Sequence, residues 1–156
     1  MKNDPIKKAR TTAYRLLAKR ARTVKQIQDT FQRQKIPVKV SEQVIDELLA
    51  AGYLDDSAYA QQFIEYQVTN KQRGPLWLRA ALLRAGVERE LINQALSAVF
   101  NPELEEILAE KYLTKICLKS NVSPQKAMRR LLSRGFSAQT ARQVTAKIIG
   151  FSAGPE

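Results

Sequence analysis

The chain has 156 residues, with 26 Lys and Arg against 15 Asp and Glu, and its formal net charge is +11. Because there is no histidine, catalytic triads of the Ser–His type and His-ligated metal sites are excluded. The single cysteine, Cys117, excludes an intramolecular disulfide and a Cys-rich metal site. The positive excess favours a polyanionic partner, such as nucleic acid, a nucleoprotein or an anionic membrane, over a basic protein with no such partner.

Helix signals follow one another along the chain, and no convincing period-2 strand pattern interrupts them. Proline stands at four first helical positions, and three of these follow a capping side chain, namely Asp4, Asn101 and Ser123. Further N-caps are predicted at Thr23 (a capping box with Gln26), Ser41, Asp55 or Asp56, and Ser137. Left-handed helix ends are predicted at Gly52, Gly86 and Gly135. The signals predict helices over residues 5–20, 23–34, 41–51, 56–72, 75–85, 88–99, 102–119, 124–134 and 137–149.

One sequence pattern occurs three times. Residues 78–87 (LRAALLRAGV) and 127–136 (AMRRLLSRGF) share a Leu-Leu pair followed by Gly and an apolar residue, at an offset of 49 residues. A weaker copy spans residues 27–36, where Lys35 occupies the glycine position. A fixed period indicates stacked copies of one supersecondary unit, which usually present an extended binding face rather than a pocket.

The predicted fold class is therefore all-α, with three tandem three-helix repeats forming an elongated, curved molecule. We expect the first repeat at residues 1–52, the second at 53–100, the third at 101–150, and a disordered tail at 151–156. No secretory h-region and no apolar run of 18 residues is found, which predicts a cytoplasmic protein without a membrane span.

Basic residues concentrate in two stretches of the chain. The first, between Pro5 and Gln28, contains no acidic residue, and part of it recurs at helical spacing. Its candidate contacts are Lys8, Arg15, Lys19, Arg20, Arg22 and Lys25. The second stretch holds Lys126, Arg129, Arg130 and Arg134, with Arg79 and Arg84 at related places in the middle repeat. Phosphate neutralisation is the functional interpretation, and a solvated, solubilising surface is the alternative.

Three other features have mainly structural interpretations. Gly52 through Asp56 is predicted to connect two repeats, with Tyr53 and Leu54 filling the core and the aspartates starting a helix. The functional alternative is that Asp55 and Asp56 form a carboxylate pair for metal binding or acid–base chemistry. The absence of histidine and of further clustered acids disfavours this alternative. Cys117 lies in an apolar helical pattern, which predicts a buried thiol. Trp77 is either a core residue or an exposed contact.

Four motifs, in order, resemble the RecX family of recombinase regulators. Residues 14–23 resemble the family's opening Leu-Leu-x-x-Arg motif, and residues 52–60 (GYLDDSAYA) resemble its most distinctive motif. Arg73-Gly74 with residues 82–87 resembles a third motif, and residues 131–137 (LLSRGFS) a fourth. Two departures are found: Ser57-Ala58 lacks the usual charged residues, and Ala85 stands where Lys is common.

The resemblance implies a non-enzymatic modulator of the RecA recombinase. It implies a protein that lies in the groove of the RecA–single-stranded DNA filament and inhibits ATP hydrolysis, strand exchange and filament extension. No catalytic residue, cofactor or metal is expected. The expected partners are the RecA filament and single-stranded DNA, with double-stranded DNA as a further candidate, no membrane, and a monomeric state.

Two other classes of function are considered. A helix-turn-helix DNA-binding protein without RecA involvement is compatible with three-helix units, but residues 88–99 carry Glu88, Glu90, Asn93 and Gln94, which suit phosphate poorly. A nuclease needs clustered carboxylates or histidine, whereas the acids here have the positions of caps and surface residues.

Overall fold

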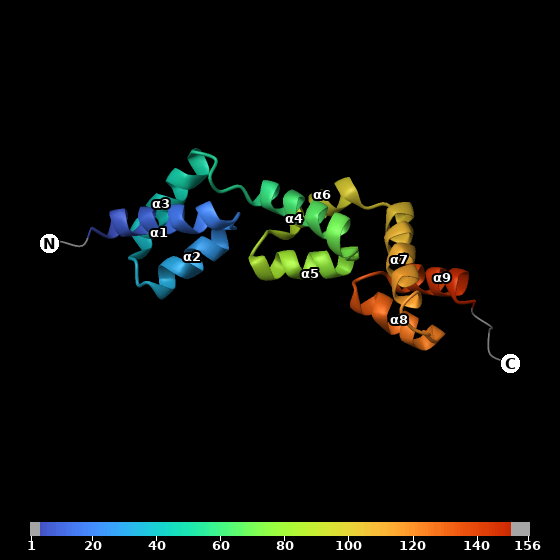
Figure 1. The fold of residues 1–156 in the computed structure, drawn as a ribbon. Helices are drawn as coiled ribbons and strands as arrows, with labels where there is room; N and C mark the ends of the chain where they lie inside the picture. The colour runs from blue at the N-terminus through green and yellow to red at the C-terminus, as the bar shows by residue number, and fades with distance from the viewer. Residues whose placement is uncertain (1–3, 151–156) are drawn as a thin grey trace. The chain divides into compact units, whose positions relative to one another are not determined.

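The computed structural model describes residues 4–150, and within this range the chain forms nine α-helices and no strand (Figure 1). The helices are α1 (Pro5–Lys19), α2 (Val24–Arg33), α3 (Val38–Ala50), α4 (Asp56–Lys71), α5 (Pro75–Ala85), α6 (Arg89–Val99), α7 (Pro102–Cys117), α8 (Pro124–Ser133) and α9 (Ala138–Ile148). The all-α prediction is confirmed, and the predicted helices match in order and number.

Most helices start where a capping side chain was predicted. The amides of Ile6, Leu104 and Lys126 donate to the side chains of Asp4, Asn101 and Ser123. A reciprocal capping box joins Thr23 and Gln26, since each side chain accepts from the other residue's backbone amide at 3.1 Å. Ser137 caps α9 by accepting from Thr140, and Asp55 caps α4 by accepting from the amide of Ala58. These bonds satisfy amides that a helix leaves without intrahelical partners.

Two local predictions are wrong. The third helix begins at Val38 rather than at residue 41, because the Ser41 amide already donates a helical bond to the Pro37 carbonyl at 2.9 Å. Tyr53 does not fill the core: it is 57% exposed and packs edge-on against the Tyr14 ring, whereas its neighbour Leu54 is buried. The left-handed Gly52 directly precedes these two residues, and of the two only Leu54 is buried.

The second helix of each repeat ends in the same left-handed turn. The residue at the turn is Lys35 after α2, Gly86 after α5 and Gly135 after α8, with φ of 57°, 90° and 95°. The following amide donates across the turn in each case, from Ile36 to Phe31 (3.0 Å), from Val87 to Leu82 (3.1 Å) and from Phe136 to Leu131 (3.2 Å). The weak first copy of the pattern therefore adopts the same Schellman turn without glycine.

The chain divides into two compact units, and this division runs through the predicted middle repeat. Unit 1 takes in the residues up to Gln61 together with Leu82–Ile92, and unit 2 takes in Gln62–Ala81 and the residues from Asn93 onward. One core cluster in unit 1 centres on Ile27, Phe31 and Leu48. Another in unit 2 centres on Leu113, Leu131 and Phe136, and half-buried Cys117 packs against it.

The predicted repeat boundaries at residues 52 and 100 and the predicted shape stay predictions, and the predicted tail at 151–156 lies outside the described residues. Between residues 4 and 150, no helix combines the length and the apolar character that crossing a bilayer requires.

Candidate nucleic-acid interface

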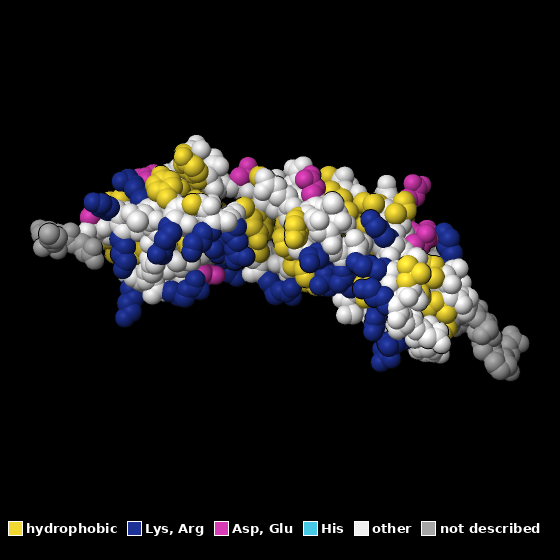
Figure 2. All heavy atoms as spheres, viewed as in Figure 1, with side chains coloured by type: hydrophobic (Ala, Val, Ile, Leu, Met, Phe, Trp, Pro, Cys, Tyr) yellow, Lys and Arg dark blue, Asp and Glu magenta, His cyan; other side chains and the backbone are white. Residues whose placement is uncertain are grey.

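The predicted cations of α1 are exposed and unpaired. Lys8, Arg15 and Lys19 lie seven and four residues apart on α1, a spacing that places them on one helix face. Figure 2 shows Lys and Arg side chains gathered over α1 and α2 of unit 1 and, in unit 2, over α8. Among the described residues, none of the twelve predicted contact residues forms an ion pair. Their charge is therefore available to an outside anion.

The ion pairs that the structure does contain use other cations. The Arg10 guanidinium donates two bonds to the Glu47 carboxylate at 2.9 and 2.7 Å, which raises the pKa of Arg10 and lowers that of Glu47. Lys147 pairs with Glu110 and Glu106, at 2.5 and 3.9 Å. Arg10 lies within the basic first stretch, but its charge is paired with Glu47 of α3.

Arg22 differs from the other cations of the first stretch. Its guanidinium is half-buried, and its Nε atom has no hydrogen-bond partner among the described residues. Burial lowers the pKa of Arg22, and the neighbouring charge of Arg20 lowers it further. It directly precedes Thr23, whose hydroxyl donates to the Ala85 carbonyl at 2.6 Å. Arg22 is therefore part of a contact between the first and middle repeats.

We call this contact the Thr23 junction. The amino terminus of α2 meets the turn after α5 there, and a Cβ atom on Gly86 would lie 2.4 Å from the Lys25 side chain. The amide of Val24 donates to the Asp56 carboxylate at 3.0 Å. Burial raises the pKa of Asp56, and the charges of Asp55 and Glu88 add to that rise, while the Val24 bond opposes it. The predicted pair Asp55 and Asp56 thus serves as helix caps.

An equivalent contact, the Gly74 junction, lies in unit 2. The amides of Gly74 and Leu76, at the start of α5, donate to the carbonyls of Arg134 and Gly135 at 2.9 and 3.0 Å. A Cβ atom on Gly135 would lie 2.3 Å from the Trp77 backbone nitrogen. Trp77, whose location the sequence left open, is thereby half-buried at the junction, with Phe63 stacked in parallel at 6.2 Å between ring centroids.

The predicted basic cluster of α8 separates into two parts. Lys126, Arg129 and Arg130 line a shallow cavity of about 290 Å³ together with Ser133. Arg134 is not among them: its guanidinium packs over the Tyr112 ring, 4.7 Å from the centroid, at the Gly74 junction. Burial lowers the pKa of Arg134, and the nearby charge of Arg73 lowers it further.

The remaining candidates lie around α5, α1 and α2. Arg79 is exposed and donates to the Asn93 side chain, and Arg84, Arg20 and Lys25 are exposed.

Sequence reasoning missed Arg73 as a candidate. Its guanidinium lies over the Trp77 ring, 4.2 Å from the centroid, and its Nε is buried without a partner among the described residues. A signal was available, because an offset of 51 residues that aligns Phe31 with Leu82 also aligns Arg22 with Arg73. Both arginines directly precede the residue that docks at a junction.

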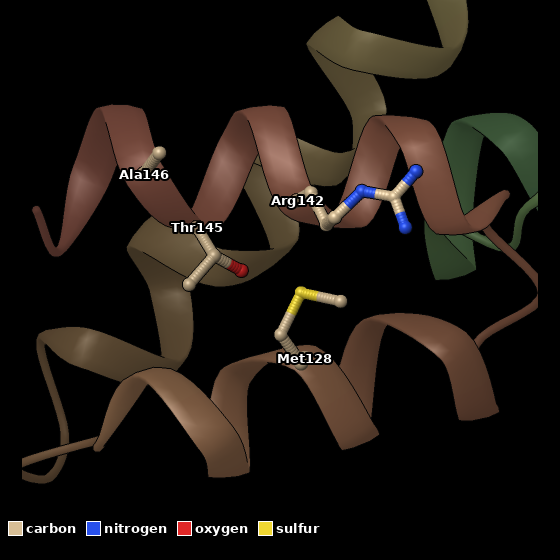
Figure 3. A pocket seen from close by; sticks show the side chains of 4 residues that line it. All are labelled: Met128, Arg142, Thr145 and Ala146. Atoms are coloured by element: carbon tan, nitrogen blue, oxygen red, sulfur yellow. The ribbon is translucent and has the colours of Figure 1, made fainter. Parts of the chain in front are cut away.

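A second cavity, of about 420 Å³, lies in the third repeat. Figure 3 shows Met128 of α8 pointing toward α9, where Arg142, Thr145 and Ala146 complete the lining. The Thr145 hydroxyl is buried without a partner among the described residues. At an offset of 49 residues it aligns with the buried Leu96, so a smaller residue stands where the middle repeat has a larger one. No group of three or more metal-ligating side chains occurs between residues 4 and 150.

Comparison with known proteins identifies the family to which the chain belongs. Models of the first and second three-helix domains of RecX match residues 9–48 and 55–96. The regulatory protein RecX of Leuconostoc citreum is 32% identical over 149 residues, which cover 91% of this chain and 55% of that protein. The regulatory protein RecX of Lactobacillus delbrueckii subsp. bulgaricus is 33% identical, with 91% and 54% covered.

A solved structure supports the same fold. The crystal structure of RecX from Lactobacillus salivarius aligns with a TM-score of 0.83 at 20% identity, covering 95% of this chain and 99% of that one. The chain spans about half the length of the curated relatives it matches first. Those relatives bear the name of a regulatory protein rather than of an enzyme. With two domain models matched in order and close relatives across nine-tenths of its length, the chain belongs to the RecX family.

Proposed function

We propose that this protein is a negative regulator of the RecA recombinase. It binds in the groove of the RecA–single-stranded DNA filament and inhibits ATP hydrolysis, strand exchange and filament extension. It acts without catalysis, as a monomer that contacts RecA and, through its basic surface, DNA. Family membership supports the RecA part of the proposal.

The observation that carries the DNA part is the unpaired state of the predicted cations. Phosphate contacts need Lys and Arg side chains whose charge is not already satisfied within the protein. Lys8, Arg15 and Lys19 meet this requirement on α1, and Lys126, Arg129 and Arg130 meet it on α8. Small helical repeats with exposed cations suit contact along a nucleoprotein surface better than chemistry in a pocket.

The test is ATP hydrolysis by RecA on single-stranded DNA, with this protein titrated in. We expect inhibition at well below one molecule per RecA. A variant with Lys8, Arg15 and Lys19 all changed to Glu should need about tenfold more protein, since each reversal removes a phosphate contact and adds a repulsion. Arg22 is left unchanged because its half-buried guanidinium belongs to the Thr23 junction.

The matched control changes Lys111, Lys115 and Lys119 to Glu, which alters the net charge equally at exposed positions outside the candidate set. Its inhibition should stay within about twofold of the unmodified protein. Equal losses in both variants would mean that only net charge matters and that α1 is no specific contact. No effect on RecA, combined with tight binding to DNA alone, would overturn the regulator and favour a helix-turn-helix-like DNA-binding protein.

A further inference from the structure

Three buried guanidine Nε atoms have no hydrogen-bond partner among the described residues, and all three lie at the junctions. They belong to Arg22 at the Thr23 junction and to Arg73 and Arg134 at the Gly74 junction. Buried polar groups in folded proteins are nearly always hydrogen-bonded, and an orphaned donor indicates a missing acceptor such as an ion. Arg73 and Arg134 lie together at one junction, which argues for a shared acceptor from outside the protein.

Arg73 and Arg134 bring two positive charges together without a carboxylate between them. Each guanidinium lies over an aromatic ring, 4.2 Å from Trp77 and 4.7 Å from Tyr112. Burial and the Arg73 charge lower the pKa of Arg134, so the two groups oppose each other's charge in a partly desolvated place. No ion pair involving either is found among the described residues. An anion between them would relieve this repulsion.

The backbone holds Arg73 in position at a conformational cost. The preceding residue, Gln72, has φ of 47° although it is not glycine, and its side chain is buried. Gln72 directly follows α4, and a left-handed residue at a helix end sets the direction in which the chain continues, here toward Arg73. On the other side of the residue, the Gly74 amide is fixed to the Arg134 carbonyl. The two arginines are therefore tied together through their own backbones.

We infer that Arg73 and Arg134 form a two-armed receptor for a phosphate oxyanion of single-stranded DNA. The inference rests on the proposed function, because the phosphate is that of the DNA in the filament. Guanidinium groups offer planar, paired N–H donors that match phosphate oxygens. Arg73 and Phe63 already contact the Trp77 ring, so the ring is not free to stack on DNA bases. The site therefore offers hydrogen-bond donors to the phosphates of the DNA backbone. Binding at this receptor is consequently independent of base sequence.

The Thr23 junction lacks this receptor and supplies the comparison. Ala85 stands at the position of Arg134, so Arg22 has no second arginine beside it. An aspartate, Asp56, also lies at this junction, and its carboxylate opposes anion binding.

The single tryptophan of the chain reports on the receptor directly. Trp77 fluorescence would be recorded while the unmodified protein is titrated with a short oligothymidine, and separately with inorganic phosphate. We expect a saturable change with both, and phosphate should compete with the oligonucleotide only at much higher concentration. A change in Trp77 fluorescence with phosphate but not with oligothymidine would indicate an adventitious ion only and would overturn the inference. The absence of a fluorescence change with either ligand would overturn it as well.

Arginine-to-lysine variants separate geometry from charge. Arg73→Lys and Arg134→Lys keep the charge but lose the planar donors, so oligothymidine affinity should fall about tenfold in each, the loss of one charge-assisted hydrogen bond. The salt dependence should stay unchanged, because it counts charges. Arg33→Lys and Arg89→Lys, at exposed positions outside the candidate set, serve as controls and should stay within about twofold. Circular dichroism confirms that each variant is folded.

Two further outcomes would overturn the receptor. Unchanged affinity in both variants would make the arginines structural. A stronger Trp77 response to an acidic peptide such as oligoglutamate than to oligothymidine would assign the site to a protein carboxylate. Neither binding measurement contains RecA. A failure of the receptor in these measurements is therefore distinguishable from a failure of the protein to inhibit RecA, which the ATP hydrolysis assay tests separately.

Discussion

The Thr23 junction and the Gly74 junction make the same connection by different chemistry. In each, the start of a second helix meets the left-handed turn that ends the second helix of the next repeat. At the Thr23 junction side chains make the link, since the Thr23 hydroxyl donates to Ala85 and Asp56 accepts from Val24. At the Gly74 junction two backbone amides of α5 donate directly to backbone carbonyls after α8.

The difference follows from one residue. Gly74 lets α5 approach so closely that an added Cβ atom would lie 2.4 Å from the Gly135 carbonyl, whereas Thr23 at the aligned position fills that space with a hydroxyl. In both arrangements the positive end of one helix dipole meets the negative end of another. The backbone version leaves no room for a capping side chain at residue 74, and Arg73 and Arg134 lie beside this contact.

The largest expected effect is that of Gly135→Ala. The new methyl group would collide with the Trp77 backbone and occupy a left-handed residue, which should destabilise the protein by about 3 kcal/mol. Gly52→Ala is the control, since Gly52 has φ of 79° with no atom within 4 Å, and it should cost about 1 kcal/mol. Urea unfolding followed by circular dichroism measures both, and equal losses would contradict a backbone-tight junction.

Thr23→Val tests the side-chain junction. It keeps the shape of a fully buried side chain but removes the cap of α2 and the bond to Ala85, which should cost about 2 kcal/mol. Thr23→Ser retains both bonds and should cost less than about 1 kcal/mol. If the two variants unfold at the same urea concentration, the hydroxyl contributes nothing and the two junctions differ less than we infer.

Lys35→Gly tests the turn that lacks glycine. Lys35 has φ of 57°, and relieving that strain should stabilise the protein by about 1 kcal/mol. Lys35→Ala removes the same charge while keeping the strain, so it should give no gain. A loss of stability in the glycine variant would indicate that the Lys35 side chain makes an energetic contribution that the turn geometry does not explain.

The smallest effect is the pH dependence contributed by Asp56. Because its pKa in the folded state is raised above 3.8, the folded protein holds this proton more tightly than the unfolded chain. The contribution of Asp56 to stability is therefore greatest below the unfolded pKa and declines as pH rises through the folded value. Relative to Asp56→Asn, the unmodified protein should lose stability between pH 3.5 and pH 7, by roughly a few tenths of a kcal/mol for a half-exposed group. A difference between the two proteins that does not change with pH would contradict the raised pKa.

Local signals predicted the elements of this protein well. The capping box at Thr23, the Asn101 and Ser123 caps and the three glycine turns depend on residues within one helical turn, so spacing alone was sufficient. The exceptions have local causes too. Pro37 started α3 earlier than Ser41 suggested, and Tyr53 turned outward after Gly52.

The sequence by itself determined the helices, their order, and the exposed cations of α1, because helical periodicity and charge are properties of neighbouring residues. Only the tertiary structure decided that Arg22 and Arg134 belong to junctions, and that Arg73 joins Arg134. The contacts responsible link residues such as Thr23 and Ala85, or Gly74 and Arg134, which lie about sixty residues apart. No local pattern encodes such a pairing, because it depends on how closely two backbones approach.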